Sequence, residues 1–296
     1  MVHIRFVCSI FLMLSKGVFA QVSAVYTVTP QQFFSHYYLL NPANTRVEDR
    51  FRLVAGNRSM VGVFSGVGVS YGDIQYTNYN PRATQANTFG VSVTNMRRGD
   101  YIQLNKIAIR YGRSSALSES VYISAGISAG VVNYRLGASQ ASAGGSDLGP
   151  DLSAGISAFS TRFLIGVSVM QILNTGLQPI NERLELKRYM NFISSYIVTL
   201  SPVSDFKFHG WYRYKPRESI PGLMISTRYV WKETLSIGPG YDLERGWFVY
   251  AGLSKVGIGE GSLEAGFSFL LVSTRQLSDL TDSIVEISVG YSMERK

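Results

Sequence analysis

Apolar residues alternate with small or polar residues along most of this chain. Near its end, for example, Val285, Ile287 and Val289 alternate with Glu286 and Ser288. Successive side chains of a β-strand point to opposite faces, so such a strand has one apolar face and one small, polar face. A soluble sheet buries the apolar face in a core. A transmembrane barrel turns that face to lipid and turns the polar face to its lumen.

Fourteen segments are candidates for such strands. Most are about ten residues long, the length that a tilted strand needs to cross a bilayer. The number is even, as in bacterial barrels built from one chain. We therefore predict an all-β fold, a closed antiparallel transmembrane β-barrel of about 14 strands. The segments are 51–60, 63–72, 87–96, 102–113, 119–134, 150–160, 162–171, 188–200, 205–215, 221–232, 234–243, 246–256, 262–273 and 283–293.

The connections between these segments differ in length. Ser160-Thr161 and Lys232-Glu233 are typical of tight turns, whereas Asp73–Asn87, Leu136–Gly149 and Asn174–Lys187 are predicted to be longer loops. Outer-membrane barrels have short periplasmic turns and longer external loops. A soluble pair of β-sandwiches is the alternative fold, and it requires a polar outer face. The second face of these strands consists mostly of Gly and Ser, which favours the barrel.

The first 20 residues are typical of a secretory signal peptide. His3 and Arg5 form a short basic region, an apolar stretch follows, and Val18-Phe19-Ala20 resembles a cleavage site. The single cysteine, Cys8, lies inside this segment, so the mature chain is expected to have no disulfide and no thiolate ligand. We predict a signal peptide over 1–20, an N-terminal periplasmic or plug segment over 21–50, and an outer-membrane barrel over 51–296.

Composition agrees with a membrane barrel. Charged residues make up 16% of the chain and the mean hydropathy is +0.08. No stretch after the signal reaches the ~18 apolar residues typical of a transmembrane helix. The formal net charge is +8, but the basic residues are scattered and the longest run is Arg97-Arg98. A nucleic-acid surface would cluster this charge, so the expected partner is outer-membrane lipid and not nucleic acid.

The alternation also assigns side chains to the two faces of the wall. A basic residue that faces lipid at mid-membrane costs about 2–4 kcal/mol. The register that turns the basic residues inward therefore sends Tyr229 and Trp231 outward, near an interface. The side chains expected to face the lumen are Lys207, His209, Trp211, Arg213 and Arg228.

Residues 30–43 do not alternate. Phe33, Phe34, Tyr37 and Tyr38 place four aromatic residues within six positions, and Asn41-Pro42 follows as a turn signal. The position of this segment, between the signal and the first strand, predicts that it packs at the periplasmic mouth of the barrel. Two interpretations stay open: the segment plugs the barrel, or it binds a periplasmic partner.

The same segment, FFSHYYLLNPAN, resembles the amino-terminal signature of the PorP/SprF family, outer-membrane proteins of the type IX secretion system of Bacteroidota. Looser matches follow at Phe89–Val93, Gly166–Asn174 and Glu286–Tyr291. The resemblance implies a role in secretion or cell-surface anchoring of cargo, such as large adhesins of gliding cells, with contacts to periplasmic components. The partner-binding residues that it suggests are Phe33, Phe34, Ser35, Tyr37, Tyr38, Asn41 and Pro42.

Residues with recognisable chemistry are sparse. Only His3, His36 and His209 are histidines, and no nucleophile elbow or phosphate-binding motif occurs in a suitable context. We therefore expect no enzyme activity, no metal and no cofactor. A passive or selective channel for small or hydrophobic solutes is the alternative function, because 14 strands is also the size of such channels.

Overall fold

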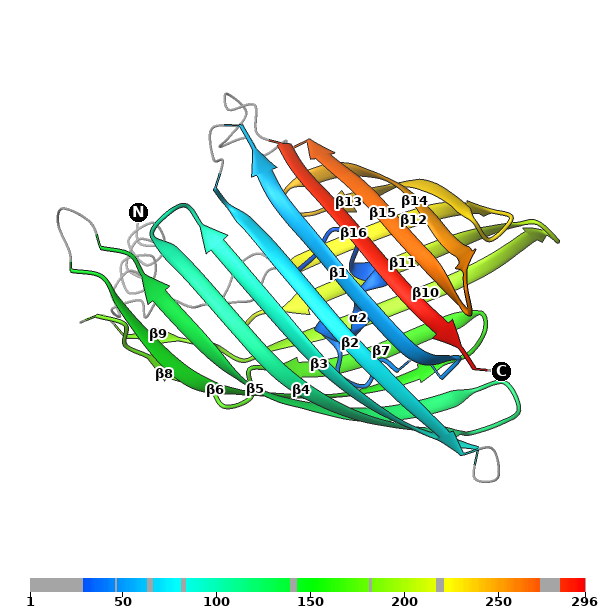
Figure 1. The fold of residues 1–296 in the computed structure, drawn as a ribbon, viewed down its shortest axis with the longest axis horizontal. Coiled ribbons are helices and arrows are strands. Elements are labelled where there is room, and N and C mark those ends of the chain that lie inside the picture. The colour runs from blue at the N-terminus through cyan, green and yellow to red at the C-terminus, as the bar shows by residue number, and fades with distance from the viewer. Residues whose placement is uncertain are drawn as a thin grey trace, which may run out of the picture.

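The first and last strands of the chain pair with each other, and this pairing closes the sheet. β1 (Asp49–Val61) and β16 (Ser283–Glu294) are antiparallel, with Ala55 opposite Val289. Every other strand of the wall pairs with its neighbours in chain order, apart from a small excursion between β7 and β10. The result is a closed barrel of fourteen antiparallel strands, as predicted (Figure 1).

This computed structural model describes residues 29–45, 47–62, 66–80, 84–138, 143–180, 183–216, 221–271 and 283–295; the predicted signal peptide and the positions up to 28 lie outside them. No helix in these ranges is long and apolar enough to cross a membrane. The other wall strands are β2 (Gly68–Asn80), β3 (Gln85–Arg98), β4 (Ile102–Ala116), β5 (Tyr122–Leu136), β6 (Gly145–Phe159), β7 (Phe163–Met170), β10 (Tyr189–Ser201), β11 (Ser204–Tyr214), β12 (Gly222–Trp231), β13 (Leu235–Asp242), β14 (Gly246–Ile258) and β15 (Gly261–Leu271). Three short elements complete the fold: η1 (Phe33–Ser35), α2 (Tyr37–Leu40) and the hairpin of β8 (Gly176–Leu177) with β9 (Leu184–Glu185).

Two strands differ from their predicted positions. β2 was expected over 63–72, but it runs over Gly68–Asn80 and takes up much of the predicted loop 73–87. Asp73 and Gln75 are buried in the lumen, whereas Ile74 and Tyr76 are exposed on the outer wall. The lumen face is polar enough to resemble a loop in composition. β6 likewise begins at Gly145, inside the predicted loop 136–149.

The outer wall is apolar and is bordered by aromatic side chains. Ile109 and Ile127 are among the exposed residues of the apolar band. Trp231 lies at one end of β12, and Trp247 lies at the opposite end of the wall, with its ring centroid 5.0 Å from that of Tyr241. Such girdles are typical of barrels whose outer face contacts lipid.

The two ends of the barrel carry connections of different length. One end, which we call the short-turn end, carries the start of β1, the end of β16 and the turns 160–162, 202–203 and 232–234. The opposite, long-loop end carries 137–144 and 171–188. Since periplasmic turns are short and external loops longer, we assign the short-turn end to the periplasm.

Cysteine labelling tests the assigned faces. With Cys8 replaced by Ser, Arg228→Cys should react with a water-soluble maleimide, because position 228 lines a lumen cavity. Tyr229→Cys and Ile237→Cys should be shielded, because both positions lie on the outer wall. Labelling is measured by mass shift in intact outer membranes and repeated after solubilisation in urea, where all three should react. Equal reaction at 228 and 229 in the membrane would contradict the register.

Candidate functional site

Residues 29–45, which we call the plug, lie inside the barrel (Figure 1). At the end of the plug nearer the long loops, Thr29 accepts hydrogen bonds from Arg58 and Arg213, which lie near the long-loop ends of β1 and β11. At the other end of the plug, the Thr45 hydroxyl lies 2.5 Å from that of Ser114, near the short-turn end of β4. The predicted packing of Phe33–Asn41 at the periplasmic mouth was wrong, because the polar wall accommodates this segment deep within the lumen.

Glu286 on β16 is the main polar anchor of the plug. Its carboxylate accepts hydrogen bonds from the backbone N–H groups of Gln31 (2.6 Å) and Gln32 (3.1 Å), and from the Tyr71 hydroxyl (3.0 Å). The Gln32 side-chain amide donates to the Glu286 carbonyl (3.0 Å) and accepts from Ser288 (2.7 Å). Glu286 is fully buried, so these bonds replace the water that its charge would otherwise require.

Aromatic side chains fill the lumen below this anchor. Phe33, Phe34 and Tyr37 are buried against Trp211 and Tyr250 of the wall. The Phe34 ring packs edge-on against Tyr250 at 5.0 Å. Burying an aromatic side chain contributes several kcal/mol, so this cluster adds apolar stability to the polar anchor.

Asn41 and Leu40 form a second attachment, on the opposite side of the lumen. The Leu40 carbonyl accepts from Ser168 (2.6 Å) and Asn191 (2.9 Å), and the Asn41 amide donates to the Ile156 carbonyl (3.0 Å). The plug lies so close to the wall here that a Cβ on Gly155 would meet the Asn41 side chain at 2.1 Å. A Cβ on Gly126 would meet the backbone of Pro42 at 2.3 Å.

A chain of hydrogen bonds joins the wall to the plug through His209. Arg228 donates to His209 Nε2 from both Nε (3.2 Å) and Nη2 (3.0 Å). Since a guanidinium only donates, His209 Nε2 is the acceptor and the imidazole proton is assigned to Nδ1. Nδ1 then donates to the Tyr37 hydroxyl (3.0 Å), which donates to the Ser194 carbonyl (3.2 Å).

The structure places the five residues expected in the lumen as follows. His209, Trp211 and Arg213 are buried on the inner face of β11, while Lys207 on β11 and Arg228 on β12 are half-buried and line a cavity. Of the seven residues suggested for partner binding, six are buried and Ser35 is half-buried. Buried in this way are Phe33, Phe34, Tyr37, Tyr38, Asn41 and Pro42.

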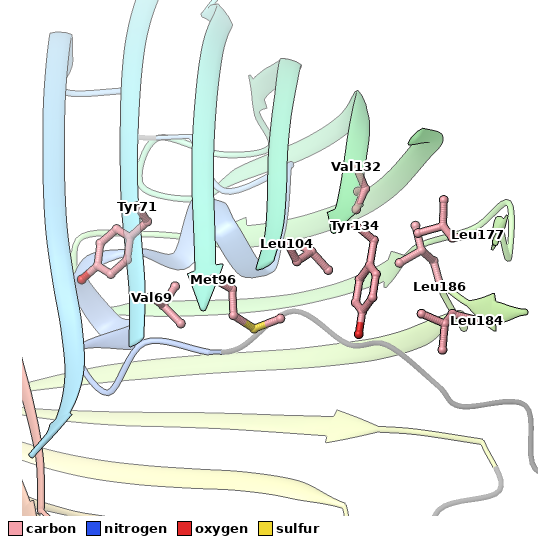
Figure 2. Close-up of a cluster of buried hydrophobic side chains, with 9 residues drawn as sticks. All are labelled: Val69, Tyr71, Met96, Leu104, Val132, Tyr134, Leu177, Leu184 and Leu186. Atoms are coloured by element: carbon pink, nitrogen blue, oxygen red, sulfur yellow. The ribbon is translucent and has the colours of Figure 1, made fainter. Parts of the chain in front are cut away.

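Ion pairs and an apolar cluster occupy other parts of the lumen. Arg110 donates to Asp73 (3.1 Å), and Lys106 lies 2.5 Å from Asp151. Towards the long-loop end, the β8–β9 excursion packs its leucines against Tyr134 and neighbouring side chains of the wall (Figure 2). The cluster consists of Val69, Tyr71, Met96, Leu104, Val132, Tyr134, Leu177, Leu184 and Leu186.

Sequence reasoning missed Glu286, Asn191 and the lumen glycines as plug contacts. Glu286 carries a weak signal, because it is the one charged residue of the predicted strand 283–293 and lies on its small, polar face. Within the described ranges, no group of three or more His, Cys, Asp or Glu side chains is arranged to hold a metal ion.

Removing the Glu286 carboxylate should loosen the plug. Glu286→Ala leaves two buried backbone N–H groups and a hydroxyl without their acceptor, which costs about 3 kcal/mol of plug docking. Hydrogen exchange of the amides at 31–45 should then accelerate roughly a hundredfold, as read by mass spectrometry on the purified barrel. Glu294→Ala, at the exposed end of the same strand, is the matched control. Unchanged exchange in Glu286→Ala would show that the other plug contacts hold the segment without this carboxylate.

Solved structures similar to this chain are outer-membrane barrels at low sequence identity. The CymD monoaromatic hydrocarbon channel has a TM-score of 0.59 at 10% identity, over 87% of this chain and 92% of that one. The Pseudomonas putida toluene transporter TodX has a TM-score of 0.54 at 10% identity, over 92% and 95%. A Pseudomonas aeruginosa FadL homologue has a TM-score of 0.52 at 9% identity, over 86% and 92%. At these identities the similarity shows the fold alone.

Sequence comparison identifies the family. No curated protein matches the chain at a significant level. A family model described as "Type IX secretion system membrane protein PorP/SprF" matches residues 22–291, which include the plug and nearly the whole wall. A closed 14-stranded barrel with an apolar outer wall is an outer-membrane architecture, in agreement with that description. This outer-membrane β-barrel therefore belongs to the PorP/SprF family of type IX secretion system membrane proteins.

Proposed function

We propose that this protein is a non-enzymatic outer-membrane component of the type IX secretion system that assists secretion or cell-surface anchoring of cargo, such as large adhesins of gliding cells. The observation that carries the proposal is the family match over residues 22–291. The filled lumen supports an assisting role. The plug is held across the lumen by Glu286, the aromatic cluster and the Asn41 attachment, so in this proposal cargo passes by another route.

Periplasmic components of the system are the proposed partners, and the plug is the proposed element that they act on. Its suggested contact residues lie inside the lumen and are mostly buried there. A partner would therefore reach them from the short-turn end or after the plug has moved. Ser35 is the most accessible of them, and its carbonyl accepts a hydrogen bond from Arg52 (3.2 Å). The many polar bonds between plug and wall favour such movement, because water can replace them when the plug leaves.

The channel alternative has weaker support. A channel requires a continuous path, whereas Glu286, the aromatic cluster and the Asn41 attachment hold the plug across the lumen. Transport of hydrocarbons is an activity of the similar barrels themselves, and at these identities the similarity shows only the fold.

Deletion of the gene in the source bacterium tests the secretion role. The amount of cargo on the cell surface and in the medium should decrease. It should return to the wild-type level when the wild-type chain is supplied in trans. Surface cargo is measured by antibody binding to intact cells, and periplasmic cargo after osmotic release. Normal cargo display in the deletion strain, together with loss of uptake of a small apolar solute, would favour the channel function instead.

Replacing Phe34, Tyr37 and Tyr38 with Ala separates docking from plugging. Each loss removes a buried aromatic side chain and costs about 3 kcal/mol or more of packing. If partners act on the plug, cargo display should fall at least severalfold while the barrel still folds and inserts. If the residues only plug, conductance in planar bilayers should rise and display should stay normal.

The matched control replaces Phe208, Tyr212 and Tyr214, one Phe and two Tyr on the outer face of β11, with Ala. This variant loses the same side chains from the lipid-facing surface and keeps the plug. Normal insertion of both variants, measured by heat-modifiable migration in gels, is the condition for comparing their cargo display.

A further inference from the structure

An open hollow of about 920 Å³ lies on the outer wall of the barrel, over β12 to β16. Its lining runs from Trp231 and Leu235, near the short-turn end, to Phe267 and Ile287 further along the wall. Pockets that hold small ligands typically have volumes of roughly 300–1,000 Å³, so the hollow is large enough for an acyl chain. It opens on the side of the wall that faces lipid.

Small side chains at two outward positions create this hollow. Ala251 on β14 lies opposite Ile237 on β13 and opposite Phe267 on β15. Ala265 on β15 lies opposite Leu253 on β14. Directly opposite side chains of antiparallel strands have Cβ atoms about 4.5–5.5 Å apart. Larger apolar side chains therefore flank both alanines closely, and the space between them is a groove of the width of one hydrocarbon chain.

A cation lies at the end of the hollow that is nearer the short turns. Lys232 directly follows β12, and its Nζ lies 4.7 Å from the ring centroid of Trp231, which lines the hollow. Tryptophan side chains are enriched at the headgroup level of a membrane. Trp231 therefore places Lys232 at headgroup level and places the rest of the hollow at acyl-chain depth.

The ammonium group of Lys232 is available to an anionic headgroup. Its side chain is exposed, and among the residues that the structure describes it has no ion-pair partner. Glu233, the acid next to it in the chain, is paired with Lys255 at 3.2 Å. Basic side chains at a membrane surface attract anionic headgroups. One cation at the end of one apolar hollow is complementary to a molecule with an anionic head and an apolar tail.

We propose that this hollow binds a phospholipid of the periplasmic leaflet, with an acyl chain over Ala251 and Ala265 and the phosphate at Lys232. The leaflet follows from the assignment of the short-turn end to the periplasm. A second copy of the barrel would cover the apolar part of the hollow, but it would not account for the cation at its end. The proposal concerns the barrel in its membrane and does not depend on the secretion role.

Native mass spectrometry of the purified full-length mature barrel tests the proposal. The protein is stripped of lipid in a neutral detergent and mixed with dioleoyl phosphatidylglycerol or with dioleoyl glycerol, which has the same chains and no phosphate. The barrel should retain one molecule of phosphatidylglycerol. Dioleoyl glycerol should bind more weakly by roughly fivefold, the contribution of one basic side chain at a membrane surface.

Variants that fill the hollow test its place on the wall. Leu in place of both Ala251 and Ala265 should weaken phosphatidylglycerol binding severalfold, because the added side chains occupy the space of the acyl chain. The matched control introduces Leu at Ala125 and Ala129, two exposed alanines in the short-turn half of β5, and should bind like the wild type. Leucine suits a lipid-facing position, and circular dichroism and heat-modifiable migration check that both variants are folded.

A charge variant tests the role of the phosphate. Lys232→Gln should weaken phosphatidylglycerol binding roughly fivefold and leave dioleoyl glycerol binding unchanged, and Lys232→Arg should restore the difference between the two lipids. Arg162→Gln, which removes an exposed cation at the same end of the barrel, should leave both affinities unchanged.

Any of four results would overturn the proposal. Equal binding of the two lipids would remove the role of the phosphate, and full affinity in the folded variant with Leu at 251 and 265 would remove the hollow. An equal loss in the β5 control would indicate general contact of lipid with the wall. A barrel dimer that the wild type forms and the filled variant does not would assign the hollow to a second copy of the chain.

Discussion

A transmembrane strand has no water with which to satisfy its backbone, and this constraint governs the rest of the molecule. Each unpaired N–H or C=O in hydrocarbon costs several kcal/mol, so the sheet must close, and β1 pairs with β16 to close it. Closure then fixes an inside and an outside. The two-residue period of a strand turns Ile287 and Val289 to lipid and Glu286 and Ser288 to the lumen. Polar side chains thus concentrate in a space too narrow to hydrate each of them freely.

The plug supplies hydrogen-bond partners for the buried polar groups of this interior. Glu286 is fully buried, and the backbone amides of Gln31 and Gln32 replace its hydration. On the opposite wall, Asn191 donates to the Leu40 carbonyl and accepts from Trp211 and Arg213. Removing one partner from such a network leaves a buried polar group without a hydrogen bond. Withdrawing the whole plug instead lets water form hydrogen bonds with the polar groups of both the plug and the wall. The interface is therefore sensitive to single substitutions and yet compatible with movement of the entire segment.

The strands of the wall could be predicted from the sequence because the pattern that specifies each strand lies within a short segment. Alternation over ten residues identifies a strand and its two faces, as for His209 and Trp211 against Phe208 and Tyr212. This reading of alternation failed at β2, where Asp73, Gln75 and Thr77 on the lumen face gave the segment the composition of a loop. The depth of the plug depends on contacts between residues more than 100 positions apart, such as Gln31 with Glu286. Glycines such as Gly155 show no signal for plug contact until the fold brings Asn41 against them.

The closeness of plug and cation pair follows from the same register. β11 and β12 place Lys207 opposite Arg228 and place His209 one inward position further along, so the cations and the imidazole lie together. Arg228 uses two of its donors on His209 Nε2, and His209 reaches Tyr37 of the plug through Nδ1. Any displacement of the Arg228 guanidinium would lengthen the Arg228–His209 bonds and weaken the orientation of the imidazole against Tyr37. The register that places these two cations opposite each other thus also positions, through one histidine, a contact that holds the plug in the barrel.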